Sequence, residues 1–450
     1  MVASGAPLGT VDDAGAVPYL VLTPPGVAGR VEAVRPPGVY APTEPLATVA
    51  GRDVAMTLRW PVRRPKPQSG RLDTVVPLLT GQRVLDVLLP VARGGTAAVP
   101  GGFGTGKTVL LQQIAKWCDA DVIVYVGCGE RGNELADVVA ELAELPDPRT
   151  GGRLSERTVV IANTSNMPIM AREASVYSAV TVAEHFRDMG RDAVVIADST
   201  SRWAEALHEL ASRSGALPAE EGYPADLASA LAAFYERAGR VATRAGREGS
   251  VTIIGAVSPP GGDMTEPVTT HTQRFVRCLW TLDRDLAYAR HYPAVSWAAS
   301  FSRDVDALAA WHLRHGDPDW VERRARIAGL LAEADRLGAL AELVGVGALP
   351  GRERVVLLAG RLLREAVLQQ SALSPVDAFS DGGRTTALAG AVLAVVDACL
   401  ARVDHGEPAA TIEEQDFSPL LRAREELGGD PADGMRARRD AMLDRLEVLQ

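Results

Sequence analysis

The chain has 450 residues, of which 47% are apolar, and a formal net charge of -10. Domains commonly contain roughly 100–200 residues, so this length predicts two to four domains. The apolar content excludes a mainly disordered protein, and the acidic balance argues against a broad nucleic-acid-binding face. The longest apolar run, Ala387 to Val396, is shorter than the roughly 18 residues that cross a bilayer. Met1 to Val11 lacks the basic and apolar regions of a signal peptide, so we expect none.

Two residue types are informative because they are rare. The four cysteines are scattered through apolar stretches without metal-ligand spacing, which favours reduced, mostly buried thiols in a cytosolic protein: Cys118, Cys128, Cys278 and Cys399. Only three of the 47 Lys and Arg residues are lysines, namely Lys66, Lys107 and Lys116. Arginine is therefore the usual basic residue of this chain, so we expect each of the three lysines to occupy a position with a specific structural or functional requirement.

Residues 1–75 are rich in proline and weakly patterned. Tyr19 to Leu22 and Gly29 to Val34 are candidate short strands, separated by proline-glycine turns. Pro61 to Pro67 holds three prolines among basic residues and is predicted to be an extended connector.

Residues 76–302 alternate between short apolar runs and helix-length segments. The runs are apolar throughout, as expected for parallel strands that are buried on both faces. The predicted strands are Thr96 to Val99, Val122 to Val126, Thr158 to Ile161, Ala193 to Ala197 and Val251 to Val257. The predicted helices are Thr108 to Trp117, Arg172 to Asp188 and Leu227 to Ala245. This alternation indicates an α/β domain with a mostly parallel sheet.

Residues 303–450 show helical periodicity and no strand-like runs. Apolar residues recur at helical spacing from Ile327 to Leu337 and from Val355 to Leu363, which predicts an α-helical C-terminal domain. The last segment, Met435 to Gln450, alternates Arg with Asp and Glu and is predicted to be a solvated helix.

One segment matches the complete G-x-x-x-x-G-K-[ST] phosphate loop: Gly101, Gly102, Phe103, Gly104, Thr105, Gly106, Lys107 and Thr108. It follows a predicted strand and opens a predicted helix, which is the context that this motif requires. The glycines let backbone N–H groups surround a phosphate chain, and the helix N-terminus adds positive charge. We expect Lys107 to contact the β- and γ-phosphates and Thr108 to bind Mg²⁺.

Two carboxylates are candidates for the chemistry beside that loop. Asp198 ends an apolar strand and is expected to bind Mg²⁺, although a helix cap formed by Asp198 to Thr200 is the alternative. Glu130 follows the strand from Val122, where it could activate an attacking water, or could instead pair with Arg131. Arg202 could reach a phosphate or form a surface salt bridge.

Several long sequence motifs make the chain resemble the catalytic A subunit of V/A-type rotary ATPases, and the resemblance runs from about Leu20 to the C-terminus. They are densest at Gly127 to Glu134, Ile161 to Glu173, Ala197 to Ala206, Glu220 to Pro224, Phe234 to Arg240 and Ile254 to Asp263. The resemblance implies a RecA-like phosphate-loop core in residues 76–302, a helical domain in 303–450, and a remnant of an inserted "bulge" region with its connector in 1–75.

The resemblance also implies roles for matching residues. Glu130 would be the catalytic carboxylate, Arg131 and Arg202 would contact phosphates, and Asp198 would hold Mg²⁺ through water. Tyr292 matches an aromatic residue that stacks on adenine, although it could be an ordinary core tyrosine. Residues 101–109, which include Val109, would bind ATP or ADP.

Two positions and the start of the chain depart from the family pattern. Leu373 stands where a second adenine-facing aromatic is usual, and Thr105 stands where eukaryotic members often carry a redox-sensitive cysteine. Family members are usually longer at the start, with an N-terminal β-barrel and most of the bulge before Pro24. From this we expect the chain on its own to assemble poorly.

The sequence therefore predicts an ATP-hydrolysing or ATP-synthesising subunit of a rotary complex on the cytoplasmic face of a bacterial or archaeal plasma membrane. A non-catalytic B subunit would supply an arginine finger, stalk subunits would complete the complex, and a separate membrane sector would move H⁺ or Na⁺. No nucleic acid is expected as a partner. Two alternatives stay open: a related hexameric RNA or protein translocase, and a non-catalytic nucleotide-binding subunit.

Overall fold

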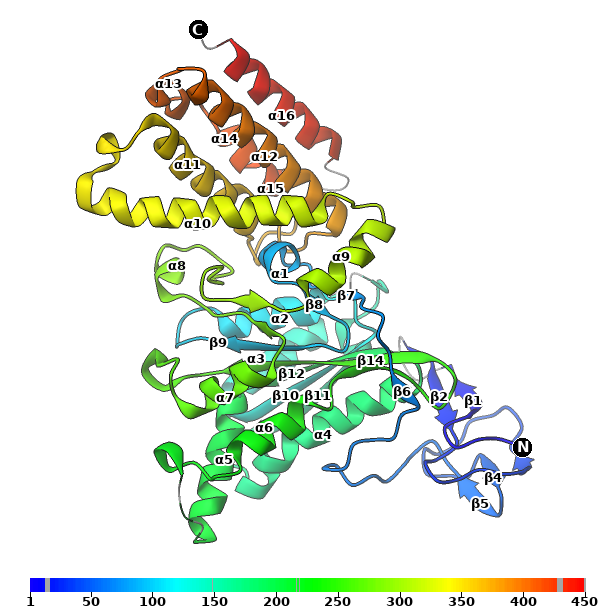
Figure 1. The fold of residues 1–450 in the computed structure, drawn as a ribbon. Helices are drawn as coiled ribbons and strands as arrows, with labels where there is room; N and C mark the ends of the chain where they lie inside the picture. Colours follow the sequence, from blue (N-terminus) through cyan, green and yellow to red (C-terminus); the bar gives the residue numbers. More distant parts are fainter. Residues whose placement is uncertain (13–16, 148, 216, 218, 427–431, 449–450) are drawn as a thin grey trace. The chain divides into compact units, whose positions relative to one another are not determined.

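The computed structural model describes all residues except 13–16, 148, 216, 218, 427–431 and 449–450. The chain forms two compact units (Figure 1). Unit 1 contains Met1–Leu78, Val91–Phe103 and Cys118–Leu279, and unit 2 contains Leu79–Pro90, Gly104–Trp117 and Trp280–Gln450.

The core of unit 1 is a parallel sheet with the strand order β11-β10-β12-β14-β9-β15. The strands are β9 (Thr96–Pro100), β10 (Val122–Glu130), β11 (Thr158–Thr164), β12 (Asp192–Asp198), β14 (Glu248–Val257) and β15 (Cys278–Leu279). The residues of β10 are buried from Val122 to Gly129 because helices cover the sheet, as uniformly apolar strands require. This confirms the predicted α/β class.

The helices of unit 1 follow the strands in alternation. They are α3 (Gly132–Glu144), α4 (Ile169–Asp188), α5 (Thr200–Arg213), α6 (Leu227–Tyr235) and α7 (Pro267–Phe275), with short 3-10 turns at Leu154–Arg157, Glu220–Gly222 and Pro260–Gly262. The long helix α4 packs against β10, β12 and β14. It is therefore the main helix that covers the centre of the sheet.

The predicted helix from Leu227 to Ala245 is wrong in its second half. Helix α6 ends at Tyr235, and Gly239–Ala242 forms strand β13, antiparallel to β14. Gly239 disfavours a helix, and the β-branched Val241 becomes buried by pairing. Strand β6 (Gly70–Arg71) pairs with the other edge of β13.

The N-terminal part of unit 1 forms small antiparallel sheets. Strands β1 (Pro7–Val11) and β2 (Tyr19–Leu22) form one pair, and β3 (Val31–Val34), β4 (Ala47–Val49) and β5 (Arg52–Val54) form another sheet. They share a small apolar core of Val21, Val27, Val49 and Val54. Strands β7 (Pro77–Leu78) and β8 (Val91–Ala92) pair nearer the main sheet.

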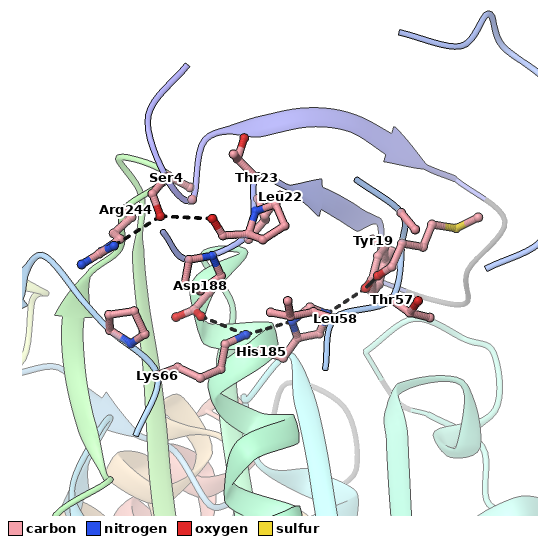
Figure 2. Close-up of a pocket in the computed structure, with 17 residues that line it drawn as sticks. Ser4, Tyr19, Leu22, Thr23, Thr57, Leu58, Lys66, His185, Asp188 and Arg244 are labelled. Carbon is pink, nitrogen blue, oxygen red and sulfur yellow. Dashed lines mark hydrogen bonds and ion pairs between the residues drawn. The ribbon is translucent and has the colours of Figure 1, made fainter. Parts of the chain in front are cut away.

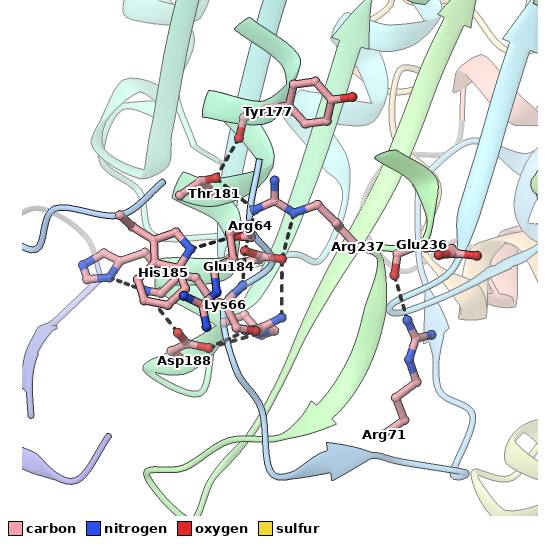
Figure 3. A network of polar contacts seen from close by, with 12 residues as sticks. Arg64, Lys66, Arg71, Tyr177, Thr181, Glu184, His185, Asp188, Glu236 and Arg237 are labelled. Carbon is pink, nitrogen blue, oxygen red and sulfur yellow. Dashed lines mark hydrogen bonds and ion pairs between the residues drawn. The ribbon is translucent and has the colours of Figure 1, made fainter. Parts of the chain in front are cut away.

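The connector, residues 61–67, runs along one face of α4. Arg63 forms a close ion pair with Glu173, and the carbonyl oxygen of Val62 accepts a hydrogen bond from Thr181 Oγ1 at 3.1 Å. Lys66 lies farther along the same helix, where its backbone N–H donates to Glu184 at 3.0 Å (Figure 3). Contrary to the prediction, the connector is not extended throughout, because it begins with a turn in which the N–H of Arg64 donates to the carbonyl oxygen of Pro61 at 2.9 Å. Side chains of α4 hold it along its length.

Unit 2 is mainly helical. It contains α1 (Arg83–Leu88), α2 (Lys107–Trp117), α8 (Arg284–Tyr288), the two-residue strand β16 (Phe301–Ser302), α9 (Val305–Arg314), α10 (Trp320–Val344), α11 (Gly351–Leu362), a π-helix at Leu363–Leu368, α12 (Gly382–Asp404), α13 (Ala409–Glu413), α14 (Ser418–Leu421), α15 (Ala423–Glu426) and α16 (Ala432–Glu447), with a 3-10 turn at Val346–Ala348. The periodic residues from Ile327 to Leu337 are buried, as predicted. The predicted helical C-terminal domain is confirmed.

The last helix is not simply solvated. Met435, Met442 and Leu446 of α16 are buried, and α16 packs against α12. The narrow apolar stripe is hidden in sequence because Arg, Asp and Glu surround it. Helix α12 is, within the described residues, the one helix that is long and apolar enough to cross a membrane, but 44% of its most apolar window is buried and it also packs against α11. A buried core helix passes the same test, so this is weak evidence for a membrane span.

Candidate active site

The ends of the parallel strands bring the predicted site residues of unit 1 to one edge of the sheet. In register, Pro100 of β9 lies beside Val257 of β14, and Asp198 of β12 lies beside Gly127 of β10. The phosphate loop, Asp198 and Glu130 therefore all leave the sheet at its carboxyl edge. Ligands of open parallel sheets bind at that edge.

The phosphate loop joins β9 to α2. The N–H of Gly101 donates to the carbonyl oxygen of Val257 at 3.1 Å, which fixes the start of the loop on the sheet. Farther along, Gly104 and Gly106 have φ values of 81° and 83°, which glycine adopts without the strain that a Cβ atom would introduce. Phe103 is fully exposed, and Lys107 is the first residue of α2. The loop has the backbone that a phosphate cradle needs.

Asp198 is the last residue of β12 and is only 6% exposed. The Tyr125 hydroxyl donates a hydrogen bond to Asp198 Oδ2 at 3.0 Å. Burial, followed by the charge of Asp198, raises the pKa of Tyr125, so the phenol stays protonated and can keep donating. The alternative that Asp198 caps a helix is not supported, because α5 has Ser199 at its N-cap and no side-chain cap bond.

Glu130 ends β10 just after an irregularity in its pairing with β11. Gly129 has φ of 70°, and a Cβ atom there would lie 2.8 Å from Arg172 Nε and 3.3 Å from Arg202 Cβ. Glycine is required at this position because two arginines close over the backbone. The carbonyl oxygen of Glu130 accepts from the N–H of Ser165 at 2.9 Å, which ties the end of β10 to the loop before α4.

Arg172 is a site residue to which sequence reasoning gave no role. It lies in the first turn of α4, and its Nη2 donates to the carbonyl oxygen of Ser165 at 2.9 Å. Its Nε is buried without a hydrogen-bond partner among the described residues. The family-like motif from Ile161 to Glu173 contains this arginine, but the spacing of its residues does not show that Arg172 packs on Gly129.

The two predicted phosphate-contacting arginines form ion pairs at the surface. Arg131 lies 3.6 Å from Glu134, and Arg202 Nη1 lies 2.9 Å from Glu205. The hydrogen bond that Arg202 donates to Glu205 is the main cause of the raised pKa of Arg202. Exposed pairs of this kind contribute about 0–1 kcal/mol, so either arginine can exchange its partner for a phosphate.

All four cysteines are buried, as predicted. Cys128 lies inside β10 rather than after it, and Ser175 Oγ lies 3.4 Å from its sulfur. Burial raises the pKa of Cys128 to about 12. The thiol beside the site is therefore unreactive at neutral pH.

Tyr292 and Leu373 belong to unit 2, where the second half of the phosphate loop also lies. Tyr292 is 41% exposed, and its ring lies 3.3 Å from the position of a Cβ atom at Gly106. It is thus not an ordinary core tyrosine. Leu373 is 96% exposed, so an apolar side chain is presented to solvent where the aromatic residue was expected.

The donors at this edge suit Mg²⁺. No cluster of three or more His, Cys, Asp or Glu that could hold a metal is found among the described residues. Mg²⁺ commonly uses one or two protein oxygens and takes its other ligands from water and phosphate. The buried carboxylate of Asp198, to which the Tyr125 hydroxyl donates, provides an oxygen of that kind.

Three protein-family models match the chain. The nucleotide-binding domain of the ATP synthase alpha/beta family matches residues 81–302, and the C-terminal domain of V and A type ATP synthase matches 309–407. The barrel-sandwich domain of the ATP synthase alpha/beta subunit matches residues 1–63. Together these matches extend over most of the sequence.

Relatives and solved structures agree with these matches. The V-type ATP synthase alpha chain of Nitrosococcus oceani is 51% identical over 429 residues, covering 94% of this chain and 72% of that protein. The same subunit of Anaeromyxobacter sp. (strain K) is 56% identical, covering 84% of this chain and 65% of its own length. A solved ATPase of a type III secretion system superposes with a TM-score of 0.61 at 26% identity, covering 80% of this chain and 94% of that one. The chain thus spans about two thirds of its curated relatives, and it belongs to the V/A-type ATP synthase family as an alpha- or A-type subunit, the type that carries the ATP hydrolase and synthase site of these complexes.

Proposed function

We propose that this chain hydrolyses or synthesises ATP as the catalytic subunit of a V/A-type rotary complex that moves H⁺ or Na⁺ through a separate membrane sector. The observation that carries the proposal is the meeting of the phosphate loop, Asp198 and Glu130 at the carboxyl edge of one sheet. Each provides one requirement of phosphoryl transfer: a phosphate cradle, a metal ligand and a carboxylate for water.

The residues have distinct roles in this proposal. Residues 101–109 bind the phosphates through backbone N–H groups, and Lys107 neutralises charge on the β- and γ-phosphates. Thr108 and Asp198 hold Mg²⁺, which supplies charge neutralisation and orientation of the phosphates when bound. Arg131, Arg202 and the newly identified Arg172 are the cations on the Glu130 side of the site.

Glu130 acts on the attacking water. A carboxylate that orients water and accepts its proton contributes roughly 10²–10⁴-fold to the rate. The ring of Tyr292 packs on adenine and extends the site from the phosphates to the base. The burial of Tyr125 keeps a neutral hydroxyl on Asp198, which fixes the carboxylate without adding a second negative charge.

The partners follow from the family. A B subunit would supply an arginine finger in trans, a contribution on the order of 10³–10⁵ in rate for phosphate-loop enzymes. Stalk subunits would join the complex on the cytoplasmic face of the plasma membrane. Within the chain, we assign 1–75 to the bulge remnant and connector, 76–302 to the nucleotide-binding core and 303–450 to the helical domain, in keeping with the matched ranges.

Phosphate release tests the proposal. The chain assembled with its B and stalk subunits is expected to release phosphate from ATP with Mg²⁺ and to stop when EDTA removes the metal. The same preparation without this chain is the control. Equal release with and without the chain, or no MgATP binding to the chain by calorimetry, would overturn the proposal.

A further inference from the structure

Two exposed side chains of unit 2, those of Tyr292 and Leu373, belong to segments that are joined by hydrogen bonds. Tyr292 precedes Pro293, and Leu373 lies in the loop after the π-helix. The N–H of Gln370 donates to the carbonyl oxygen of Tyr292 at 2.7 Å, and the Gln369 side chain donates to the carbonyl oxygen of Arg290 at 3.3 Å. The loop that carries Leu373 therefore sets the position of the backbone that carries Tyr292.

Arg83 of α1 binds the backbone at the start of the loop that carries Leu373. Its side chain is completely buried, and it donates to the carbonyl oxygens of Val367 at 2.6 Å and Gln369 at 2.5 Å. Its backbone N–H donates to Gln370 Oε1 at 2.9 Å. One buried arginine thus satisfies three acceptors within four residues of chain.

Asp377 closes the other end of the loop. Its side chain is also completely buried, and Oδ1 lies 2.8 Å from Arg83 Nη2. Oδ2 accepts from the N–H of Ser371 at 2.7 Å and lies 2.6 Å from Arg424 Nη1. Leu373 lies between Ser371 and Asp377, so this one carboxylate fixes both ends of the turn that presents Leu373.

Positive charges outnumber negative ones around Asp377. Arg83 and Arg424 share its single carboxylate. Burial, as the largest cause, and the nearby charges of Arg384 and Arg424 lower the pKa of Arg83 to about 10, although Asp377 acts to raise it. Loss of Asp377 would leave the completely buried Arg83 guanidinium without its ion-pair partner, and Arg424 would keep only its pair with the half-exposed Glu425 at 2.9 Å. Loss of Arg424, in contrast, leaves the Arg83–Asp377 pair intact. Arg424 is therefore the position where the link can be cut with the least damage to folding.

We propose that Asp377 and Arg424 are positioning residues for the base half of the nucleotide site. The inference rests on the proposed function. Arg424 lies in α15 (Ala423–Glu426), within the helical C-terminal region. The link Arg424–Asp377–Ser371 therefore makes the placement of Leu373 and Tyr292 depend on a helix to which the proposed function assigns no nucleotide contact. Contacts to the phosphates are formed by other residues and are independent of this link.

The test separates base contacts from phosphate contacts. Arg424→Gln removes the charge but keeps much of the side-chain volume, and calorimetry measures binding of MgATP and of magnesium tripolyphosphate, which has no base. We expect MgATP binding to weaken by about fivefold or more, because a base loses a well-placed stacking partner. Tripolyphosphate binding should stay within about twofold. Arg424→Lys, which keeps the ion pair with Asp377, should restore most of the MgATP affinity.

Arg352→Gln is the matched control, because it breaks an exposed ion pair with Asp404 in the same helical region. This variant should leave the affinities for MgATP and for magnesium tripolyphosphate unchanged. Unchanged MgATP affinity in Arg424→Gln, or equal weakening of both ligands, would overturn the positioning role. If the parent chain binds tripolyphosphate but not MgATP, or binds neither ligand, the proposed function is wrong, and the inference that rests on it is wrong as well.

Discussion

An ion pair joins the buried Lys66 of the connector to the partly buried Asp188 at the end of α4, with 3.1 Å between Nζ and Oδ2. The same ammonium lies 3.1 Å from His185 Nδ1, and His185 Nε2 lies 2.7 Å from the Tyr19 hydroxyl (Figure 2). Tyr19 in turn donates to the carbonyl oxygen of Met56 at 2.6 Å. This series of contacts fastens the small N-terminal sheets to the helix that covers the main sheet.

The geometry explains why a lysine occurs here in a chain dominated by arginine. Lys66 is 5% exposed, and its compact ammonium fits between a carboxylate and an imidazole. Lys66→Arg should lower the free energy of unfolding by about 1–3 kcal/mol, because the planar guanidinium overpacks the site. Urea unfolding measures this, with Lys116→Arg on helix α2 as the control. Equal stability of the two variants would contradict the explanation.

His185 should make the free energy of unfolding depend on pH in the acidic range. Burial, followed by the charge of Lys66, lowers the pKa of His185 to about 3, compared with roughly 6.5 in the unfolded chain. Between these values the unfolded state binds more protons, so stability falls as pH falls from 6.5 and is unaffected above it. The loss approaches about 1.4 kcal/mol per pH unit.

The matched variant for this effect is His185→Gln. The amide can donate to Tyr19 and accept from Lys66 without titrating. Unfolding free energies from pH 7 to pH 5 should therefore fall less steeply in the variant than in the parent. His291 and His312, whose pKa values burial lowers to about 4, remain in both proteins and cancel in the comparison. Parallel curves would show that His185 is not held neutral.

The sequence predicts the centre of the fold better than its borders. The central residues of β10 (122–126) and β12 (193–197) are apolar throughout, and burial on both faces is the simplest explanation of such a run. The prediction fails at Gly239–Ala242, where pairing with β14 overrides a helical pattern, and at α16, where three apolar residues are hidden among charges. Both outcomes depend on a partner element that is distant in sequence.

The same distinction holds at the site. The motif alone places residues 101–108, since backbone conformation and chemistry are encoded locally. The contact of Arg172 with Gly129 and the link from Arg424 to Asp377 join residues more than 40 positions apart. No local pattern indicates them, because they depend on how strands and helices pack.

Cys128 should not act as a redox switch. Its burial raises its pKa to about 12, so almost none of the thiol is ionised at neutral pH. Mild peroxide treatment should leave ATP hydrolysis of the complex unchanged in the parent and in Cys128→Ala alike. Inactivation of the parent that dithiothreitol reverses, and that the Ala variant escapes, would show that the thiol is accessible.

Lys107→Ala should weaken binding as well as turnover. Lys107 begins α2 directly after the phosphate loop, and its loss leaves the phosphate charge less compensated. Calorimetry should show MgATP affinity reduced by about tenfold or more, equivalent to about 1.4 kcal/mol. Lys116→Ala, on the same helix, is the control and should bind normally. Unchanged affinity in Lys107→Ala would remove this residue from the site.

Glu130→Gln should separate binding from chemistry. The amide has nearly the shape of the carboxylate, and the backbone hydrogen bond from Ser165 to residue 130 is unaffected, so the end of β10 should stay in place. The amide cannot accept a proton from water, so phosphate release by the complex should fall by roughly 10²–10⁴-fold. MgATP affinity should stay within about twofold, since Glu130 is not needed to hold phosphate. Glu134→Gln, in the first turn of α3, is the matched control and should keep most of the activity. A Glu130→Gln complex that works at even half the parent rate would mean that another group activates the water.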